Sequence, residues 1–114
     1  MARILVVEDE ALVALLIEET LREAGFQIAG CTDSPDKALA ILDECDCDAA
    51  VLDATLHGKS VEPVATALHR RGMPFVFISG YSRIQLHEQF IDAPLLSKPF
   101  KPEHLIRTIK RILP

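Results

Sequence analysis

The sequence predicts an α/β fold with one parallel β-sheet, and three features of the chain support this prediction. Short apolar runs recur along the chain and end at polar or turn residues, as at Ile4–Val7, Ala49–Leu52 and Phe75–Ile78. Such runs are typical of strands buried on both faces of a parallel sheet. Segments with helical spacing of apolar residues separate them, which gives the βα alternation of doubly wound domains. A chain of 114 residues with 49% hydrophobic content is enough for one domain with one core.

The expected elements alternate along the whole chain. Strands are predicted over residues 3–8, 26–31, 48–53, 75–78 and 95–96. Helices are predicted over residues 10–24, from Pro35, from Ser60 to Gly72, over residues 82–92 and from Pro102. This alternation predicts right-handed crossovers, but it leaves the order of the strands in the sheet open.

Turn and capping residues predict the ends of the first two helices. Asp9 can cap the helix over 10–24, and Gly25 suits the position just past its end. Ser34 caps the second helix, with Pro35 at the first helical position. The buried stripe of that second helix is Ala38, Leu39, Ile41 and Leu42.

The later helices have similar signals. Ser60 caps the third helix, Pro63 is tolerated because it falls in the first turn, and Gly72 ends the helix. Residues 82–92 have only a rough helical period, which predicts a short or mobile fourth helix. Pro102 begins the last helix, whose apolar stripe has a clear spacing of three and four residues. That stripe is Leu105, Ile106, Ile109, Ile112 and Leu113.

Chemically active side chains follow the apolar runs. Glu8 and Asp9 end the first strand, Asp53 the third and Ser79 the fourth, and Lys98 follows the fifth. Parallel strands bring their carboxyl ends to one edge of the sheet, where ligands bind. Crowded carboxylates repel each other and favour a hard divalent cation, for which Mg²⁺ is most suitable. The set therefore predicts a phosphoryl-transfer site with Asp53 as the nucleophile.

In these residues and their order, the chain resembles the receiver domain of two-component response regulators. The matching pieces span essentially all 114 residues and are Glu8-Asp9, Asp53, Ser79-Gly80 and Lys98-Pro99. The segments from Pro74 to Tyr81 and from Ser97 to Phe100 are also similar to stand-alone receivers with a Phe-Ala-Thr-Gly-Tyr-type fourth strand. The resemblance implies a flavodoxin-like fold whose five-stranded sheet has the order 2-1-3-4-5 and is flanked by five helices. It also implies a receiver domain over residues 1–114 with no effector domain.

The resemblance implies which residues handle the phosphoryl group. Asp53 would be the phosphoacceptor, and Lys98 would pair first with its carboxylate and then with the phosphate. Ser79 would move toward the phosphate, and the backbone N–H of Gly80 would meet a phosphate oxygen. The peptide bond between Lys98 and Pro99 would be cis, which costs little only before proline.

The resemblance also implies a Mg²⁺ site. Asp9 and Asp53 would bind the metal directly, and Glu8 would act largely through water. The backbone carbonyl of Thr55 would complete the protein ligands, and its backbone N–H would meet the phosphate.

Two regions depart from the family pattern. Leu95 occupies the position where receivers usually carry an aromatic residue, which argues against the usual hydroxyl-to-aromatic switch. We hypothesise instead that Gly80 is a flexible hinge next to the large ring of Tyr81, which could open or close over the site. In the loop after Asp53, the usual proline and glycine positions hold His57 and Val61, so a different loop shape is expected. His57 lies near the mouth of the site, where a solvated role is favoured over contact with phosphate.

The resemblance implies a signalling role rather than that of an ordinary enzyme. The phosphohistidine of a histidine kinase or phosphotransfer protein would be the donor, and the domain would assist its own phosphorylation and dephosphorylation. A downstream protein would bind the face made by the fourth helix, fifth strand and fifth helix. Two alternatives remain open. One is an interaction module that works without phosphate, and the other is a small Mg²⁺-dependent phosphohydrolase, although Thr55 stands where such enzymes commonly have a second acid.

Composition excludes several other classes of protein. The net charge is −5 and no basic stripe is present, which argues against nucleic-acid binding. No apolar stretch is long enough to cross a membrane, and the N-terminus lacks a signal-peptide pattern. The odd count of three cysteines, Cys31, Cys45 and Cys47, has no zinc spacing and predicts reduced thiols in the cytoplasm.

Overall fold

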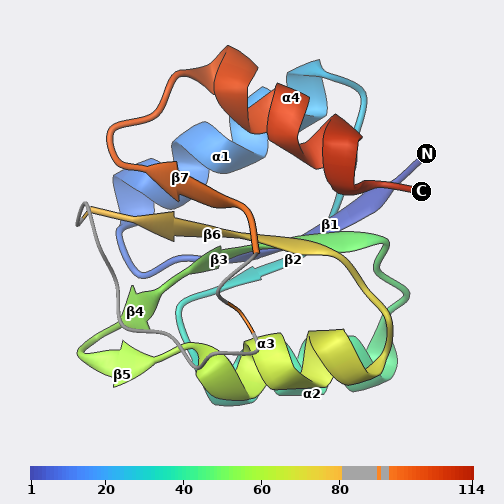
Figure 1. Cartoon of the computed structure of the whole chain (residues 1–114), viewed down its shortest axis with the longest axis vertical. Coiled ribbons are helices and arrows are strands. Elements are labelled where there is room, and N and C mark those ends of the chain that lie inside the picture. The colour runs from blue at the N-terminus through green and yellow to red at the C-terminus, as the bar shows by residue number, and fades with distance from the viewer. Residues whose placement is uncertain (81–89, 91–92) are drawn as a thin grey trace.

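The computed structural model describes residues 1–80, 90 and 93–114, and within them a five-stranded sheet forms the centre of the molecule (Figure 1). The sheet strands are β1 (Arg3–Val7), β2 (Gln27–Thr32), β3 (Ala49–Asp53), β6 (Phe75–Ser79) and β7 (Leu95–Ser97). Their order is β2-β1-β3-β6-β7, and every neighbouring pair is parallel. Counted along the sheet strands alone, this is the order 2-1-3-4-5, so the predicted topology is confirmed.

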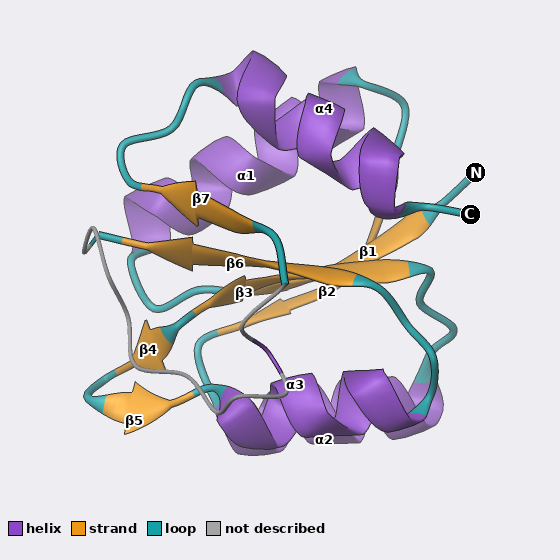
Figure 2. Cartoon of the chain, viewed as in Figure 1, coloured by secondary structure: helices purple, strands orange, loops and turns teal. Residues whose placement is uncertain are grey.

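Helices cover both faces of the sheet (Figure 2). One face carries α1 (Ala11–Glu23) and α4 (Pro102–Ile112). The opposite face carries α2 (Pro35–Glu44) and α3 (Glu62–Arg70). The described residues thus hold four of the five predicted helices, because the remaining one, predicted over residues 82–92, lies outside them except for Phe90. None of the described helices is long and apolar enough to span a membrane.

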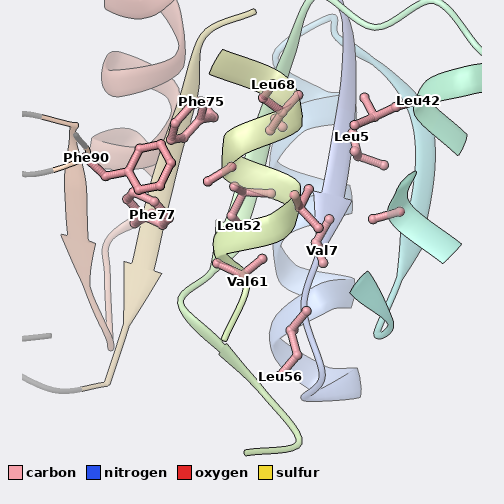
Figure 3. Close-up of a cluster of buried hydrophobic side chains, with 14 residues drawn as sticks. Leu5, Val7, Leu42, Leu52, Leu56, Val61, Leu68, Phe75, Phe77 and Phe90 are labelled. Carbon is pink, nitrogen blue, oxygen red and sulfur yellow. The ribbon is translucent and has the colours of Figure 1, made fainter. Parts of the chain in front are cut away.

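The core has one hydrophobic cluster on each side of the sheet. Along β1, successive side chains point to opposite faces, so Leu5 and Val7 belong to one cluster and Ile4 and Val6 to the other. All four side chains are fully buried. Figure 3 shows the cluster under α2 and α3, where the rings of Phe75, Phe77 and Phe90 pack edge to face. This two-sided burial explains why the strands read as continuous apolar runs.

The start of α1 differs from the prediction. Its N-cap is Glu10, and no side chain caps it. The proposed cap by Asp9 is therefore wrong, because Asp9 Oδ2 accepts a hydrogen bond from the backbone N–H of His57 instead, at 2.9 Å. The end of α1 is as expected, since Gly25 follows it with a positive φ of 94°.

The other helix starts follow the prediction more closely. Ser34 is the N-cap of α2, and its hydroxyl accepts from the backbone N–H of Lys37 at 3.3 Å. The N-cap of α3 is Val61, one residue later than predicted. The hydroxyl of Ser60 still accepts from the N–H of Glu62 at 3.1 Å, so it serves the first turn from outside the helix.

A small hairpin follows β3 where the sequence predicted only a loop. It consists of β4 (Thr55–Leu56) and β5 (Lys59–Ser60), which pair antiparallel. The two residues between them have positive φ, 48° at His57 and 79° at Gly58. This conformation gives a two-residue turn whose twist matches that of the flanking strands. That this shape differs from that of other receivers, as His57 and Val61 predict, stays a prediction.

The order of the strands places a crevice at the carboxyl ends of β1 and β3. The chain adds β2 on one side of β1 and then crosses back to add β3, β6 and β7 on the other side. The connections from β1 and β3 therefore leave toward opposite faces of the sheet (Figure 1). Ligands of open α/β sheets bind between such strand ends, and a pocket lies there in this protein.

The buried and exposed faces of α1 predict how substitutions on this helix change the stability of the protein. Ile17 is fully buried on α1, whereas Leu12 of the same helix is 82% exposed. Replacing Ile17 by alanine should lower the free energy of unfolding by about 2–5 kcal/mol, because it leaves a cavity under the sheet. Leu12→Ala should change it by less than about 0.5 kcal/mol. Urea denaturation of both variants measures this difference, and equal losses would contradict the assigned faces of α1.

Candidate functional site

The predicted site residues meet in one pocket at the carboxyl edge of the sheet. The pocket has a volume of about 450 Å³ and is lined by Asp9, Glu10, Asp53, Thr55, Gly58, Ser79, Gly80 and Lys98. Glu8 lies beneath it, 3% exposed, and reaches the same lysine. The structure thus brings together every residue that the sequence proposed for the site, and adds Glu10 and Gly58.

Strand pairing fixes the positions of these residues. Asp53 is the last residue of β3 and pairs with Ile78 of β6. Ser79 is the last residue of β6, and its carbonyl accepts a hydrogen bond of 2.7 Å from the backbone N–H of Lys98. On the other side, the backbone N–H of Glu8 continues the ladder by donating to the carbonyl of Thr32 at 3.0 Å. The side chains of the site therefore project from a rigid sheet edge.

Lys98 links three carboxylates. Its Nζ lies 2.9 Å from Glu8 Oε1, 3.0 Å from Glu10 Oε1 and 3.4 Å from Asp53 Oδ2. Only 14% of the lysine side chain is exposed, so water weakly screens its contacts with the buried carboxylates of Glu8 and Asp53. The peptide bond between Lys98 and Pro99 is cis, as predicted.

The surroundings of Asp53 disfavour its negative charge. Burial, hydrogen bonding with the carboxyls of Glu8 and Asp9, and the charge of Glu8 together raise the pKa of Asp53 to about 8, although Lys98 opposes the shift. An anion in this position needs a further positive charge beside it to be stable near neutral pH.

The pKa values of Lys98 and Asp9, two neighbours of Asp53, shift in opposite directions. Burial tends to lower the pKa of Lys98, but its contacts with Glu8 and Glu10 and the charge of Asp53 outweigh this, so its pKa is raised. Partial burial tends to raise the pKa of Asp9, but the backbone N–H of His57 and hydrogen bonds with Asp53 and Glu8 prevail, so its pKa is lowered. Lys98 and Asp9 are therefore both charged at neutral pH.

The donor set suits a hard divalent cation. Carboxylate oxygens of Glu8, Asp9 and Glu10 come within 4.8 Å of one another, and Asp53 adds a further carboxylate to the same pocket. Among the described residues, Glu8 Oε1 is a buried oxygen that accepts no hydrogen bond, although it is in ion-pair contact with Lys98. An under-satisfied buried oxygen and a destabilised Asp53 anion are both relieved by a cation with oxygen ligands. The residues present therefore fit Mg²⁺.

His57 contacts the site from the hairpin turn. Besides donating its backbone N–H to Asp9, it places Nε2 3.2 Å from Asp33 Oδ2. This hydrogen bond lowers the pKa of Asp33. His57 does not line the pocket, and its side chain is 61% exposed, which agrees with the solvated role that the sequence favoured.

Sequence reasoning missed Glu10, which it assigned only to the predicted helix over 10–24. A signal existed, because Glu10 continues the acidic run Glu8-Asp9 directly before that helix. Leu95, in place of the usual aromatic residue, is 41% exposed on β7. The hinge proposed at Gly80 and Tyr81 falls largely outside the described residues, since Tyr81 is not among them.

Comparison with known proteins identifies the family. The family model described as the response regulator receiver domain matches residues 4–110. The chain belongs to the response regulator receiver domain family. Among curated proteins it is 30% identical to the sensory transduction protein RegX3 of Mycobacterium bovis, over 99% of this chain and 51% of that protein. It is 28% identical to the transcriptional regulatory protein PdtaR of Mycobacterium tuberculosis, over 95% of this chain and 55% of that one. The receiver domain thus spans about half the length of these relatives.

Two solved structures are matched along nearly their whole length. SdrG from Sphingomonas melonis Fr1 superposes with a TM-score of 0.87 at 36% identity, covering 98% of this chain and 96% of that one. The response regulator TrrA from Thermotoga maritima, solved in complex with Mg²⁺ and BeF, gives a TM-score of 0.87 at 27% identity and covers 99% and 100% of the two chains. Both likenesses include the sheet edge at which the pocket lies.

The raised pKa of Asp53 makes the stability of the metal-free receiver domain depend on pH. Between about pH 4 and about pH 8 the folded state keeps a proton on Asp53 that the unfolded chain has lost, so the free energy of unfolding falls as pH rises. Asp53→Asn removes this penalty. In EDTA it should stabilise the protein by about 1–2 kcal/mol near pH 8 and by much less near pH 5.

Urea denaturation of both proteins at the two pH values measures this difference. Asp46→Asn provides the matched control, because Asp46 is exposed before β3 and away from the pocket. A stabilisation by Asp53→Asn that is equal at both pH values would contradict the shifted pKa.

Proposed function

We propose that this receiver domain accepts a phosphoryl group on Asp53 from the phosphohistidine of a histidine kinase or phosphotransfer protein. The observation that best supports this is the position of Asp53. It ends a central strand, lines the pocket and lies 3.4 Å from the ammonium of Lys98. A buried carboxylate beside a fixed positive charge and an open pocket is the arrangement that an acyl-phosphate intermediate requires.

In the proposed transfer, a carboxylate oxygen of Asp53 bonds to phosphorus as the phosphorus–nitrogen bond of the donor breaks, and the electron pair of that bond stays with the nitrogen of the departing histidine. The negatively charged oxygens of the transferred group enter the pocket, where Lys98 would bind one of them. Ser79, Thr55 and Gly80 line the same pocket. The hydroxyl of Ser79 and the backbone N–H groups of Thr55 and Gly80 would donate to the other oxygens. Ser79 ends β6 and Thr55 lies in β4, so the fold places both residues at the pocket before the reaction and little reorganisation is needed.

The same pocket would hold Mg²⁺. Its protein ligands would be Asp9, Asp53 and the backbone carbonyl of Thr55, with Glu8 acting largely through water. When bound, Mg²⁺ supplies positive charge that stabilises the oxygens of the transferring group and keeps the acceptor carboxylate ionised. The protein would also assist hydrolysis of its own acyl phosphate by admitting a water molecule to the pocket.

The output would be a change in protein partners. The surface that we assign to this role combines β7, α4 and the segment 82–92, which lies outside the described residues except for Phe90. Because Leu95 is aliphatic, the signal would have to reach this surface without an aromatic residue at that position. The match with the SdrG chain covers 98% of residues 1–114 and 96% of that chain, which supports these residues folding as one receiver unit. Three free thiols, at Cys31, Cys45 and Cys47, agree with a reducing cytoplasm.

Phosphorylation by a small donor tests the proposal. Incubation with acetyl phosphate and Mg²⁺ should add the mass of one phosphoryl group to the intact protein. Asp53→Asn should abolish the adduct because the nucleophilic carboxylate is lost, and excess EDTA should reduce it by at least about tenfold because the cation is removed. Intact-protein mass spectrometry is the measurement.

Asp46→Asn is again the control and should phosphorylate like the wild type. An adduct that persists in Asp53→Asn would place the acceptor elsewhere and contradict the proposal. Multiple turnover of varied phosphomonoesters would favour a phosphohydrolase instead. A correctly folded wild type that forms no adduct would favour an interaction module that works without phosphate.

A further inference from the structure

The ammonium of Lys98 has a partner that the proposed reaction does not use. Glu10 Oε1 lies 3.0 Å from Nζ in hydrogen-bonding geometry, closer than Asp53 Oδ2 at 3.4 Å. The pairing spans 88 positions of the sequence, so it arises from the fold rather than from neighbouring residues. In the metal-free protein, Lys98 is thus held more closely by Glu10 than by the proposed phosphoacceptor.

The local structure directs Glu10 toward the lysine. Glu10 is the N-cap residue of α1, where a side chain normally accepts a hydrogen bond from the first turn, yet it makes no such bond. Its backbone N–H donates to Glu8 Oε2 at 3.0 Å, which fixes the backbone beside the pocket. The carboxylate of Glu10 therefore pairs with Lys98 instead of capping its own helix.

Glu10 also differs from the other acids around Lys98 in its exposure. Its side chain is 63% exposed, whereas Glu8 and Asp53 are almost fully buried, with 1% and 8% of their side chains exposed. An exposed carboxylate can release its partner into water at little cost, because water replaces the lost contact. Water does not reach a buried carboxylate in this way, so releasing its partner costs more. Of the three contacts, the one with Glu10 is therefore the easiest to break.

Glu10 and Lys98 also lie between two neighbouring pockets on the surface. Both line the pocket that contains Asp53, and both line a second pocket of about 380 Å³ that includes Val13, Leu16 and Phe100. A change in their pairing would alter the wall that these two pockets share.

We infer that Glu10 is a positioning residue that holds Lys98 in the unphosphorylated state and competes with the phosphoryl group for it. The inference rests on the proposed function of Asp53 and adds a residue to it. Lys98 must turn from Glu10 to a phosphoryl oxygen, so the strength of the Glu10 contact sets part of the cost of phosphorylation. Weakening that contact makes the phosphorylated state easier to reach.

Binding of beryllofluoride, a phosphoryl analogue, measures this competition without turnover. It is titrated at saturating Mg²⁺ into the wild type, Glu10→Gln, Glu10→Asp and Glu19→Gln. Glu10→Gln removes the charge, whereas Glu10→Asp keeps the charge but shortens the side chain by one methylene, so that it loses contact with Lys98. Glu19→Gln makes the same charge change at an exposed position of α1 outside both pockets.

We expect both Glu10 variants to bind beryllofluoride about two- to fivefold more tightly than the wild type, the range that fits a partly exposed ion pair. Glu19→Gln should match the wild type. Unchanged affinity in both Glu10 variants would overturn the inference. Tighter binding by Glu10→Gln alone would also overturn it, because it would show that Glu10 acts only by repelling the anion.

The proposed function is checked in the same experiment. If the folded wild type binds no beryllofluoride, or if Asp53→Asn binds it equally well, both the proposed function and the inference fail. If binding requires Asp53 but ignores Glu10, only the inference fails. Urea denaturation of each variant confirms that the proteins compared are folded.

Discussion

The site is organised around the pairing of one partly buried ammonium with several carboxylates at the edge of the sheet. The fold gathers Glu8, Asp9, Glu10 and Asp53 into a small volume, and among the described residues Lys98 is the cation that contacts three of them. One positive charge does not balance four negative ones. Burial, together with the neighbouring carboxyls of Glu8 and Asp9, therefore raises the pKa of Asp53 to about 8. Binding of an additional cation in the pocket would thus stabilise the ionised carboxylates.

The sheet holds these charged side chains close together despite their repulsion. Strands buried on both faces fix the backbone at the ends of β1, β3 and β6, so the acids that follow β1 and β3 cannot separate without disturbing the core. The strand order also matters, because β1 and β3 are neighbours and their connecting segments leave toward opposite faces. The closeness of Glu8, which follows β1, and Asp53, which ends β3, results from that topology. Hydrophobic burial in the core therefore offsets the free-energy cost of the repulsion among the carboxylates in the pocket.

Most of this architecture could be predicted from the sequence, because its signals are strong and local. Apolar runs ending at Glu8, Asp53 and Ser79 predicted strands and their functional ends, and resemblance to receivers supplied the strand order. The contact between Glu10 and Lys98 could not be predicted, since pairing over 88 positions depends on side-chain directions that only the fold determines. The choice between capping and other contacts also needed the structure, and this explains the error at Asp9. The hairpin β4–β5 was missed because two-residue strands leave little pattern in a sequence.

The central claim is that the acids at the ends of β1 and β3 hold a divalent cation, with Lys98 facing the phosphoacceptor. A crystal structure of the protein with Mg²⁺ and beryllofluoride tests it most directly. We expect density for the cation against the carboxylates of Asp9 and Asp53, beryllofluoride on Asp53, and the ammonium of Lys98 turned from Glu10 toward a fluorine. A cation bound elsewhere, or beryllofluoride absent from Asp53 at saturating concentration, would contradict the account.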